Sequence, residues 1–396
     1  MIETLPEGWR SVPFWSLFYR DKQIGFPEEE LLSVYREYGV IRKEDRDDNH
    51  NRAGDDLASY QLVEPGDLVL NKMKTWQGSL GISGYRGIVS PAYFVYKSRN
   101  SESSEFLHYA LRSRYYVTQY ASFSKGVRPS QWDLQPEYLS MMRMLLPPLS
   151  TQKTIVKYLA QETGEIDAML ATLDELTETL RQRRVRVIQS AVKYSRSIGI
   201  GLMLEVKLGK MLQTKPKSPT DRFQPYLRAA HIQPGGRLDL TIDTKEMYFS
   251  EPESVVLGLR AGDAVIVEGG AGFGRAAYLT EDMPGWGFQN SIIRLRGASA
   301  DTRYAVYALQ AALESGEIAM ACNAATFAHF TAEKVEGFRI PYHGTDEHRR
   351  IADHLDEVTG RIDAMLATID ELKALLVERR AALITDVVTG RKKVPA

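Results

Sequence analysis

One twelve-residue segment occurs twice in this chain and limits the folds that it can adopt. EIDAMLATLDEL begins at Glu165 and RIDAMLATIDEL begins at Arg361, so ten of twelve positions are identical at a separation of 196 residues. The same separation aligns Ile155 with Ile351, and EPGDLVL (64–70) with RAGDAVI (260–266). The chain therefore contains an internal duplication, and each half consists of a variable domain followed by a long helical segment.

The helical segments carry an apolar residue at every seventh position. No proline interrupts 151–195 or 346–394, and intermediate apolar residues such as Met169 and Leu170 widen the apolar face into the seam of a coiled coil. The pattern predicts helices of roughly 40 residues, or about 60 Å. The seam consists of Leu159, Ile166, Leu173, Leu180 and Val187 in the first helix and Leu355, Ile362, Ile369, Leu376 and Leu383 in the second.

The charges along these helices predict how they pair. The first helix has acidic residues but no Lys or Arg from Glu162 to Glu178, and basic residues but no Asp or Glu from Arg181 to Arg196. The second helix repeats this order more weakly. Antiparallel packing sets acidic halves against basic halves, so the charges select the orientation while the apolar seam supplies stability. The alternative is two independent amphipathic helices on a surface.

The sequence divides into four segments. We expect a first domain at 1–150, a first long helix at 151–196, a second domain at 197–342 and a second long helix at 343–396. Both domains combine short β-branched runs, such as 67–73 and 263–269, with helical segments at 104–121 and 302–316. These patterns predict an α+β fold: two mixed α/β domains separated by two long helices that form an antiparallel coiled coil, with a pseudo-twofold internal repeat.

Composition and motifs exclude several classes of protein. The 396 residues include 43% hydrophobic and 26% charged residues, and no apolar run approaches the length of a membrane span. The single cysteine, Cys322, and the polar amino terminus fit a cytoplasmic protein without a leader peptide. The net charge of −1 neither supports nor excludes nucleic-acid binding.

No catalytic or metal-binding motif is complete. EGGAGFGRAA (268–277) lacks the spacing of a phosphate-binding loop, so we interpret it as a turn between strands. Glu205-Val206-Lys207 has no nearby Asp partner and is interpreted as a strand edge, and Cys322 as a small buried residue. We therefore expect a chain that is not an enzyme, with no metal site.

Basic, aromatic and amide side chains gather in the loops of both domains. Arg and Lys can contact phosphates or guanine edges, whereas Gln and Asn suit adenine, although each residue could equally be a solvated loop residue. The candidates for DNA contact are Lys72, Lys74, Trp76, Gln77, Lys125, Arg128, Ser130, Gln131 and Trp132 in the first domain and Arg228, His231, Gln233, Phe273, Arg275, Gln289, Asn290, Thr326 and His329 in the second.

Two variable domains, each followed by a near-identical long helix, resemble the specificity subunit of type I restriction–modification systems. LPPLSTQKTIVKYLAQETGEIDAML (146–170) is similar to the family's entry into its first conserved helix, with Thr151 in place of an acidic residue. ERRAALITDVVTGR (378–391) resembles its closing segment, and NKMKTWQGSLGIS and VRPSQWDLQPEYL resemble the frame of its target-recognition domains. IPYHGTDEHRRI departs from the pattern, because Pro341 stands alone and the segment is expected to be about three residues longer.

The resemblance implies a non-catalytic reader of DNA. Each domain would recognise one half of a bipartite, asymmetric double-stranded site, and the helix pair would set the spacer and dock two methyltransferase subunits. Restriction motor–nuclease subunits would complete the complex, and S-adenosylmethionine, ATP and Mg²⁺ would belong to the partner subunits. Two alternatives are a coiled-coil interaction scaffold that does not bind DNA and an enzyme that acts alone.

Overall fold

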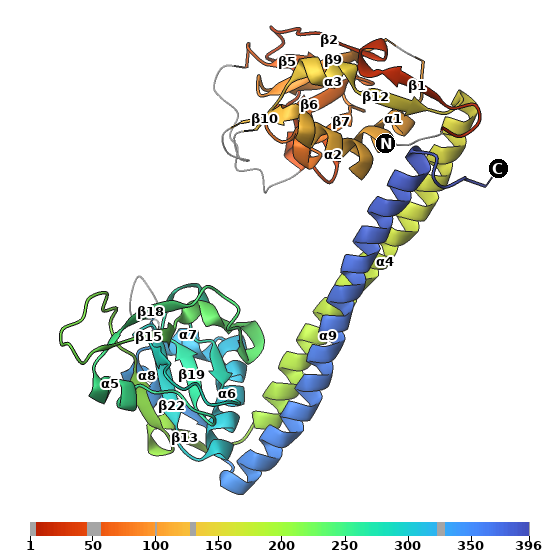
Figure 1. Ribbon diagram of the computed structural model, residues 1–396. Helices are drawn as coiled ribbons and strands as arrows, with labels where there is room; N and C mark the ends of the chain where they lie inside the picture. The colour runs from red at the N-terminus through yellow and green to blue at the C-terminus, as the bar shows by residue number, and fades with distance from the viewer. Residues whose placement is uncertain (1–4, 46–56, 100, 127–131, 323–328, 396) are drawn as a thin grey trace. The chain divides into compact units, whose positions relative to one another are not determined.

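The computed structural model describes residues 5–45, 57–99, 101–126, 132–322 and 329–395 (Figure 1). The chain forms two compact units, one of Met1–Leu173 with Asp370–Ala396 and the other of Asp174–Ile369. Each unit therefore combines one mixed domain with part of each long helix, and the boundaries between units fall inside the helices rather than at their ends. Among the described residues, no helix is both long and apolar enough to cross a membrane.

The first domain alternates short strands with a few helices. Its helices are α1 (Ser104–Arg112), α2 (Arg114–Phe123) and α3 (Pro136–Met141), with 3₁₀ turns η1 (Phe14–Ser16), η2 (Lys43–Asp45) and η3 (Thr75–Gln77). Its strands are β1 (Arg10–Pro13), β2 (Phe18–Arg20), β3 (Leu32–Tyr35), β4 (Gly39–Arg42), β5 (Gln61–Val63), β6 (Leu68–Asn71), β7 (Leu80–Ile82), β8 (Gly87–Val89), β9 (Tyr93–Ser98), β10 (Ser124–Lys125), β11 (Asp133–Leu134) and β12 (Arg143–Leu146).

The second domain has the same mixed composition. Its helices are α5 (Glu251–Val256), α6 (Ser299–Glu314), α7 (Glu317–Cys322) and α8 (Ala332–Gly337), with 3₁₀ turns η5 (Ile200–Leu202), η6 (Ala229–His231), η7 (Pro234–Gly236) and η8 (Gly270–Gly272). Its strands are β13 (Ser197–Gly199), β14 (Glu205–Leu208), β15 (Arg222–Leu227), β16 (Ile232–Gln233), β17 (Arg237–Leu238), β18 (Lys245–Phe249), β19 (Ala264–Val267), β20 (Ala276–Tyr278), β21 (Gly287–Phe288), β22 (Ile292–Arg296) and β23 (Arg339–Pro341).

A four-stranded antiparallel sheet is repeated in the two domains. Its strand order is β2-β9-β6-β7 in the first domain and β14-β22-β19-β20 in the second. A further antiparallel pair also recurs, because β1 pairs with β12 as β13 pairs with β23. Arg143 and Arg339 fix these pairs in the same way, each donating from Nε to a serine Oγ at 3.1 Å, on Ser11 and Ser197 respectively. The duplication in sequence is thus a duplication in structure.

The repeated EPGD and RAGD segments form the same capped turn. Gly66 and Gly262 have φ values of +93° and +90°, which side chains other than glycine rarely adopt. The next residue, Asp67 or Asp263, accepts a hydrogen bond from the backbone N–H three residues earlier, at 2.6 and 2.9 Å. A cation on the neighbouring strand pairs with each buried carboxylate: Lys97 in the first domain and Arg296 in the second. Burial raises the pKa of Asp67, while Lys97 opposes this shift.

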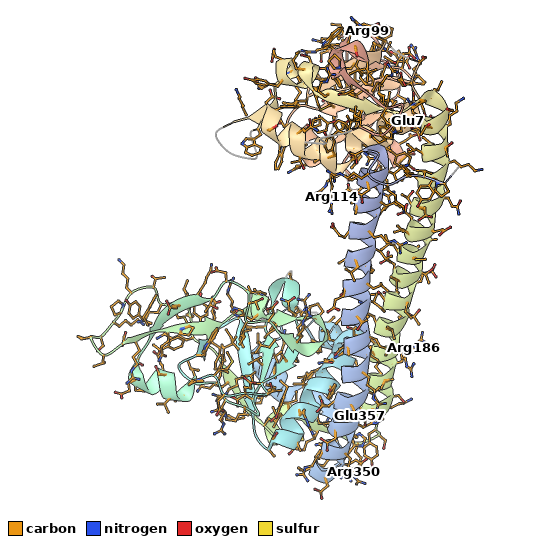
Figure 2. The ribbon with its side chains drawn as sticks, turned by 45° about the vertical axis from the view of Figure 1, so that its right-hand side comes forward. Glu7, Arg99, Arg114, Arg186, Arg350 and Glu357 are labelled. Atoms are coloured by element: carbon orange, nitrogen blue, oxygen red, sulfur yellow. The ribbon has the colours of Figure 1, made fainter. Side chains whose placement is uncertain are left out.

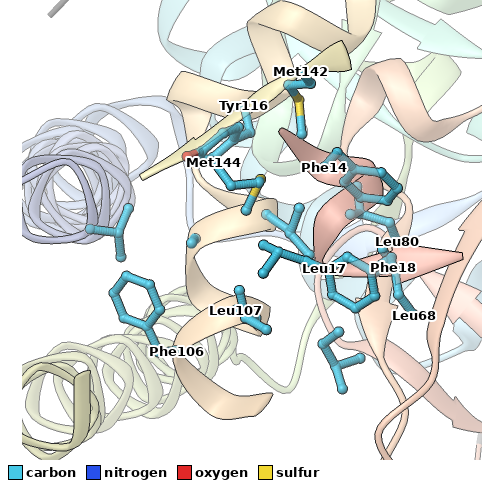
Figure 3. Close-up of a cluster of buried hydrophobic side chains, with 14 of the residues drawn as sticks. Phe14, Leu17, Phe18, Leu68, Leu80, Phe106, Leu107, Tyr116, Met142 and Met144 are labelled. Atoms are coloured by element: carbon cyan, nitrogen blue, oxygen red, sulfur yellow. The ribbon is translucent and has the colours of Figure 1, made fainter. Parts of the chain in front are cut away.

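Each sheet packs against helices of its own domain. In the first domain, aromatic and aliphatic side chains from η1, β2, β6 and β7 meet those of α1 and α2 (Figure 3). Burying each large apolar side chain contributes about 1.5–3 kcal/mol. The cluster includes Phe14, Leu17, Phe18, Leu68, Leu80, Phe106, Leu107, Tyr116, Met142 and Met144. The sheet is therefore held on one side, and its loops project from the ends of the strands.

The two long helices are α4 (Leu149–Val192) and α9 (Thr345–Val388), each of 44 residues. Their first residues are 196 positions apart, the separation seen in the sequence. We expected the segment before the second helix to be about three residues longer, and this is wrong. Thr345 takes the place of Leu149, although the two prolines that precede Leu149 have no counterpart before Thr345. The predicted starts at 151 and 343 each differ from the observed starts by two residues.

The helices pack through the apolar face and pair antiparallel. Eight of the ten seam residues are buried, whereas Leu173 and Val187 are half-buried. Arg184 Nε lies 3.0 Å from Asp363 Oδ1 in the second unit, and Arg380 Nε lies 3.0 Å from Asp167 Oδ1 in the first. Each pair joins the basic half of one helix to the acidic half of the other, which confirms the antiparallel coiled coil inferred from the charges.

A buried polar residue fastens the second turn of each long helix to its domain. Gln152 and His348 occupy equivalent positions and are both fully buried. Gln152 accepts from Ser103 N–H at 2.9 Å and donates to Pro147 O at 2.9 Å. His348 Nδ1 lies 2.7 Å from Asp301 Oδ1, and its Nε2 accepts from His343 N–H at 3.1 Å. The imidazole of His348 thus provides one hydrogen-bond acceptor and one donor, as the amide of Gln152 does. Burial lowers the pKa of His348.

Candidate nucleic-acid interface

The loop between β6 and β7 presents four of the candidate residues at one end of the first sheet. The Asn71 side chain accepts hydrogen bonds from the Met73 and Lys74 N–H groups, both at 3.1 Å, and so shapes the loop. Lys74 and Gln77 are exposed, and Trp76 is half-buried with its Nε1 donating to Met73 O at 3.0 Å. The fourth, Lys72, opens the loop. A local hydrogen-bond network therefore shapes the loop, from which Lys74 and Gln77 face solvent.

The second candidate segment of this domain joins that loop. Leu134 N–H donates to Lys72 O at 3.0 Å, and the rings of Trp76 and Trp132 lie 5.1 Å apart. Lys125 pairs with Asp133 across β10 and β11, and its Nζ lies 3.1 Å from Tyr138 Oη. The structure thus brings Lys72, Trp76, Lys125 and Trp132 together. Three further candidates, Arg128, Ser130 and Gln131, lie outside the described residues.

Arg20 and Lys22 add positive charge at the same edge and were missed in the sequence. The guanidinium of Arg20 lies 4.4 Å from the Phe94 ring centre, and Lys72 Nζ lies 4.9 Å from it. Burial and the nearby charge of Arg20 lower the pKa of Lys72. β2 runs parallel to β6 within the sheet order β2-β9-β6-β7, so the carboxyl ends of both strands share one edge. Strand order cannot be read from the sequence, so no sequence pattern indicates that these residues lie close together.

In the second domain, the equivalent edge carries Arg228, Gln289 and Asn290. β15 and β21 are parallel, and Gln289 N–H donates to Leu227 O at 2.9 Å, which sets Gln289 beside Arg228. Asn290 N–H donates to Lys210 O at 2.9 Å. Arg228 Nη2 donates to Asp243 O at 2.6 Å. The two amides, which are 61 and 62 residues from Arg228 in sequence, therefore form one edge with it.

His231 and Gln233 take other places than the residues of this edge. His231 is fully buried, and its Nδ1 accepts the Arg228 N–H at 3.1 Å, so it positions Arg228 and does not face a ligand directly. Burial and the charge of Arg228 lower the pKa of His231. The Gln233 amide donates to Ala230 O at 2.7 Å and is half-buried. The sequence could not show the burial of these side chains, because a polar residue in a short loop has no periodic pattern.

The glycine loop at 268–274 connects β19 to β20, as expected for a turn between strands. Phe273 packs against the core, and Arg275 lines a cavity of about 210 Å³ together with Arg184 and Gln310. The exposed His329 ring lies against Gly269, where an added Cβ would meet it at 3.3 Å. Of these candidates, His329 belongs to the edge, whereas Phe273 and Arg275 face the interior of the domain. Thr326 lies outside the described residues.

Four further basic residues of the second domain were not identified as candidates from the sequence. Lys210 forms an isolated bridge with Gln289 and pairs with Glu253, and the exposed Lys215, Lys217 and Arg222 follow along the same segment. The signal in the sequence was the basic run KPKSPTDR (215–222). Among the described residues, no group of three or more His, Cys, Asp or Glu side chains could hold a metal ion.

The helix pair offers a second kind of surface. In the second unit, a groove of about 610 Å³ opens between α4 and α9. Figure 2 shows Arg186 on α4 and Arg350 on α9, which both line it. Its apolar floor consists of Val187, Ala191 and Ile351. Glu347 also lines the groove and pairs with Arg350, so the groove combines an apolar floor with charges of both signs and suits a protein segment with apolar and polar side chains.

Part of the chain is similar to known proteins. A family model described as the type I restriction modification DNA specificity domain matches residues 198–374. The type I restriction enzyme StySPI specificity subunit of Salmonella potsdam is 21% identical over 209 residues, which cover 48% of this chain and 43% of that subunit. The EcoKI specificity subunit of Escherichia coli (strain K12) is 21% identical over 202 residues, with the same coverage of 48% and 43%. The chain thus matches less than half the length of these relatives.

Solved structures share the fold over nearly the whole chain. A chain from a structure of complex assembly and conformational transition of the type I R-M system has a TM-score of 0.75 at 16% identity, covering 98% of this chain and 100% of that one. The HsdS subunit from Thermoanaerobacter tengcongensis has a TM-score of 0.53 at 15% identity, covering 99% of each chain. With its duplicated helices and repeated sheets, the chain shares the fold of these solved structures, and its residues 198–374 match the type I restriction modification DNA specificity domain.

Proposed function

We propose that this chain is the non-catalytic DNA-recognition subunit of a type I restriction–modification complex, in which each variable domain reads one half of a bipartite, asymmetric site. One observation carries the proposal. The two domains share a four-stranded sheet with the same strand order, yet the same edge carries different side chains, Lys72, Lys74 and Trp76 in the first domain and Arg228, Gln289 and Asn290 in the second. A common frame with different contact groups is what two different half-sites require.

The helix pair would set the gap between half-sites and dock two methyltransferase subunits. The long helix occurs in two near-identical copies, so each copy can offer the same surface to a subunit of the same kind. The repetition therefore supports two docking subunits. The groove lined by Arg186, Ile351 and Arg350 would accept part of such a partner in the second unit. S-adenosylmethionine, ATP and Mg²⁺ would be bound by the methyltransferase and motor–nuclease subunits, in the cytoplasm where DNA is accessible.

A salt titration of DNA binding tests the proposal. The chain, co-expressed with its methyltransferase, should bind duplex DNA with an affinity that falls steeply as salt rises, because each phosphate contact contributes about 0.9 to the slope of log K against log[salt]. Lys74→Ala removes an exposed cation from the loop after β6 and should reduce this slope by about one for every sequence.

Arg99→Ala is the matched control. Arg99 is also exposed, but it follows the carboxyl end of β9 and therefore lies at the opposite edge of the same sheet (Figure 2). This variant should leave the slope unchanged. A complex that binds no DNA even at low salt would favour the interaction scaffold instead.

A further inference from the structure

The second domain exposes a large apolar side chain beside its two amides. Met211 is 74% exposed, the neighbouring Leu212 is 52% exposed, and neither contributes to the core clusters. Met211 and Leu212 are adjacent, so together they form a small exposed apolar patch, and apolar patches bordered by polar groups mark contact surfaces. We infer that Met211 contacts the 5-methyl group of a thymine, and that the second half-site contains an A·T pair read by this side chain with Asn290 or Gln289.

The backbone before Met211 is locked to the strand that presents the amides. Lys210 N–H donates to Phe288 O at 3.0 Å, and Lys210 O accepts from Asn290 N–H at 2.9 Å. Gly209 lies so close to this strand that an added Cβ would meet Gln289 O at 2.2 Å. Met211 therefore follows directly from a residue whose position is fixed relative to Asn290, and the two side chains act from one edge.

The chemistry of the pair matches one base pair. In the major groove, adenine presents an N7 acceptor and an N6 donor, which an Asn or Gln amide satisfies with two hydrogen bonds, and thymine presents its methyl group, which suits an apolar side chain. An amide beside a methionine therefore provides both contacts that distinguish A·T from the other pairs. A G·C pair offers no methyl group and would leave Met211 without an apolar partner.

Charge around Met211 favours nucleic acid over a protein partner. Lys215, Lys217 and Arg222 are exposed along the segment that follows, and Gln213 O accepts from Tyr248 N–H at 3.0 Å, which keeps this segment on the domain. These cations can take phosphate oxygens of the same duplex. This inference rests on the proposed function and adds the identity of a recognised base.

Replacing thymine by deoxyuridine removes the methyl group alone and tests the contact. The complex of this chain with its methyltransferase is bound to duplexes carrying its methylation motif, with each thymine of the second half-site replaced in turn. At one position, deoxyuridine should weaken binding about four-fold, the effect of losing one buried methyl group. Met211→Ala should weaken binding to the thymine duplex by a similar factor and abolish the difference between thymine and deoxyuridine.

Leu202→Ala is the control, because Leu202 is 79% exposed but precedes β14, at the other end of the strand that leads to Met211. It should behave as the unaltered chain in every duplex. Three results would overturn the inference while leaving the proposed function standing: a second half-site without an A·T pair, binding insensitive to deoxyuridine at every position, or a Met211→Ala chain that binds DNA normally but loses its methyltransferase. A complex without any sequence-specific binding would overturn the proposed function itself.

Discussion

Replacing Asp263 with alanine is expected to lower the free energy of unfolding of the second domain by about 3 kcal/mol. Its side chain is 1% exposed, and its two oxygens accept from Arg296 Nε and Nη2, both at 2.7 Å. One oxygen also caps the turn at Arg260 N–H, 2.9 Å away. The substitution would leave the guanidinium of Arg296, itself 19% exposed, without its carboxylate and the turn without its cap.

Denaturant unfolding followed by circular dichroism measures this effect. Asp243→Ala is the matched control, because the Asp243 carboxylate lies 3.9 Å from Arg228 Nη2 but its side chain is 80% exposed, and loss of an exposed pair should cost less than about 1 kcal/mol. Equal midpoints for the two variants would show that the repeated turn does not depend on its buried carboxylate.

Inserting seven residues into both long helices is expected to change the gap in the DNA site without changing either half. Seven residues keep the apolar seam in register and add about 10 Å to each helix, so the gap should lengthen by up to about three base pairs. The insertions belong after Glu175 and after Glu371. These points lie midway between Asp167 and Arg184 and midway between Asp363 and Arg380, the residues of the two ion pairs, and are therefore opposite each other.

The methylated motif of cells that express the lengthened chain with its methyltransferase reports the gap. A five-residue insertion at the same points is the control, because it turns the seam by about 140° and should abolish assembly. An unchanged gap in a fully methylating seven-residue variant would mean that the helix pair does not measure the distance between half-sites.

The sequence was most informative where structure is local or repeated. Heptads and charge order predicted α4, α9 and their antiparallel pairing, and β-branched runs located β6 and β19. The helix expected at 104–121 is two helices, because Ser113 is extended (φ −66°, ψ 152°) although neither glycine nor proline marks the break. Packing of α1 and α2 against the sheet, which no local pattern encodes, decides this turn.

The interface was harder to predict because it depends on strand order. Lys72 and Trp76 were found through local composition, but Arg20 meets them only because β2 and β6 are parallel within the sheet. Similarly, Lys210 reaches Asn290 from 80 residues away through one backbone hydrogen bond. His231, also a candidate for DNA contact, is buried and accepts the Arg228 N–H, a placement that its polar character does not indicate.

Sequencing the methylated bases of DNA from cells that express this chain with its methyltransferase tests the central claim most directly. Two domains with one frame and different contact residues should yield a single motif with two short, dissimilar specific halves separated by a gap of fixed length. A continuous palindromic motif would contradict the account, because it would require both domains to read the same bases with different side chains.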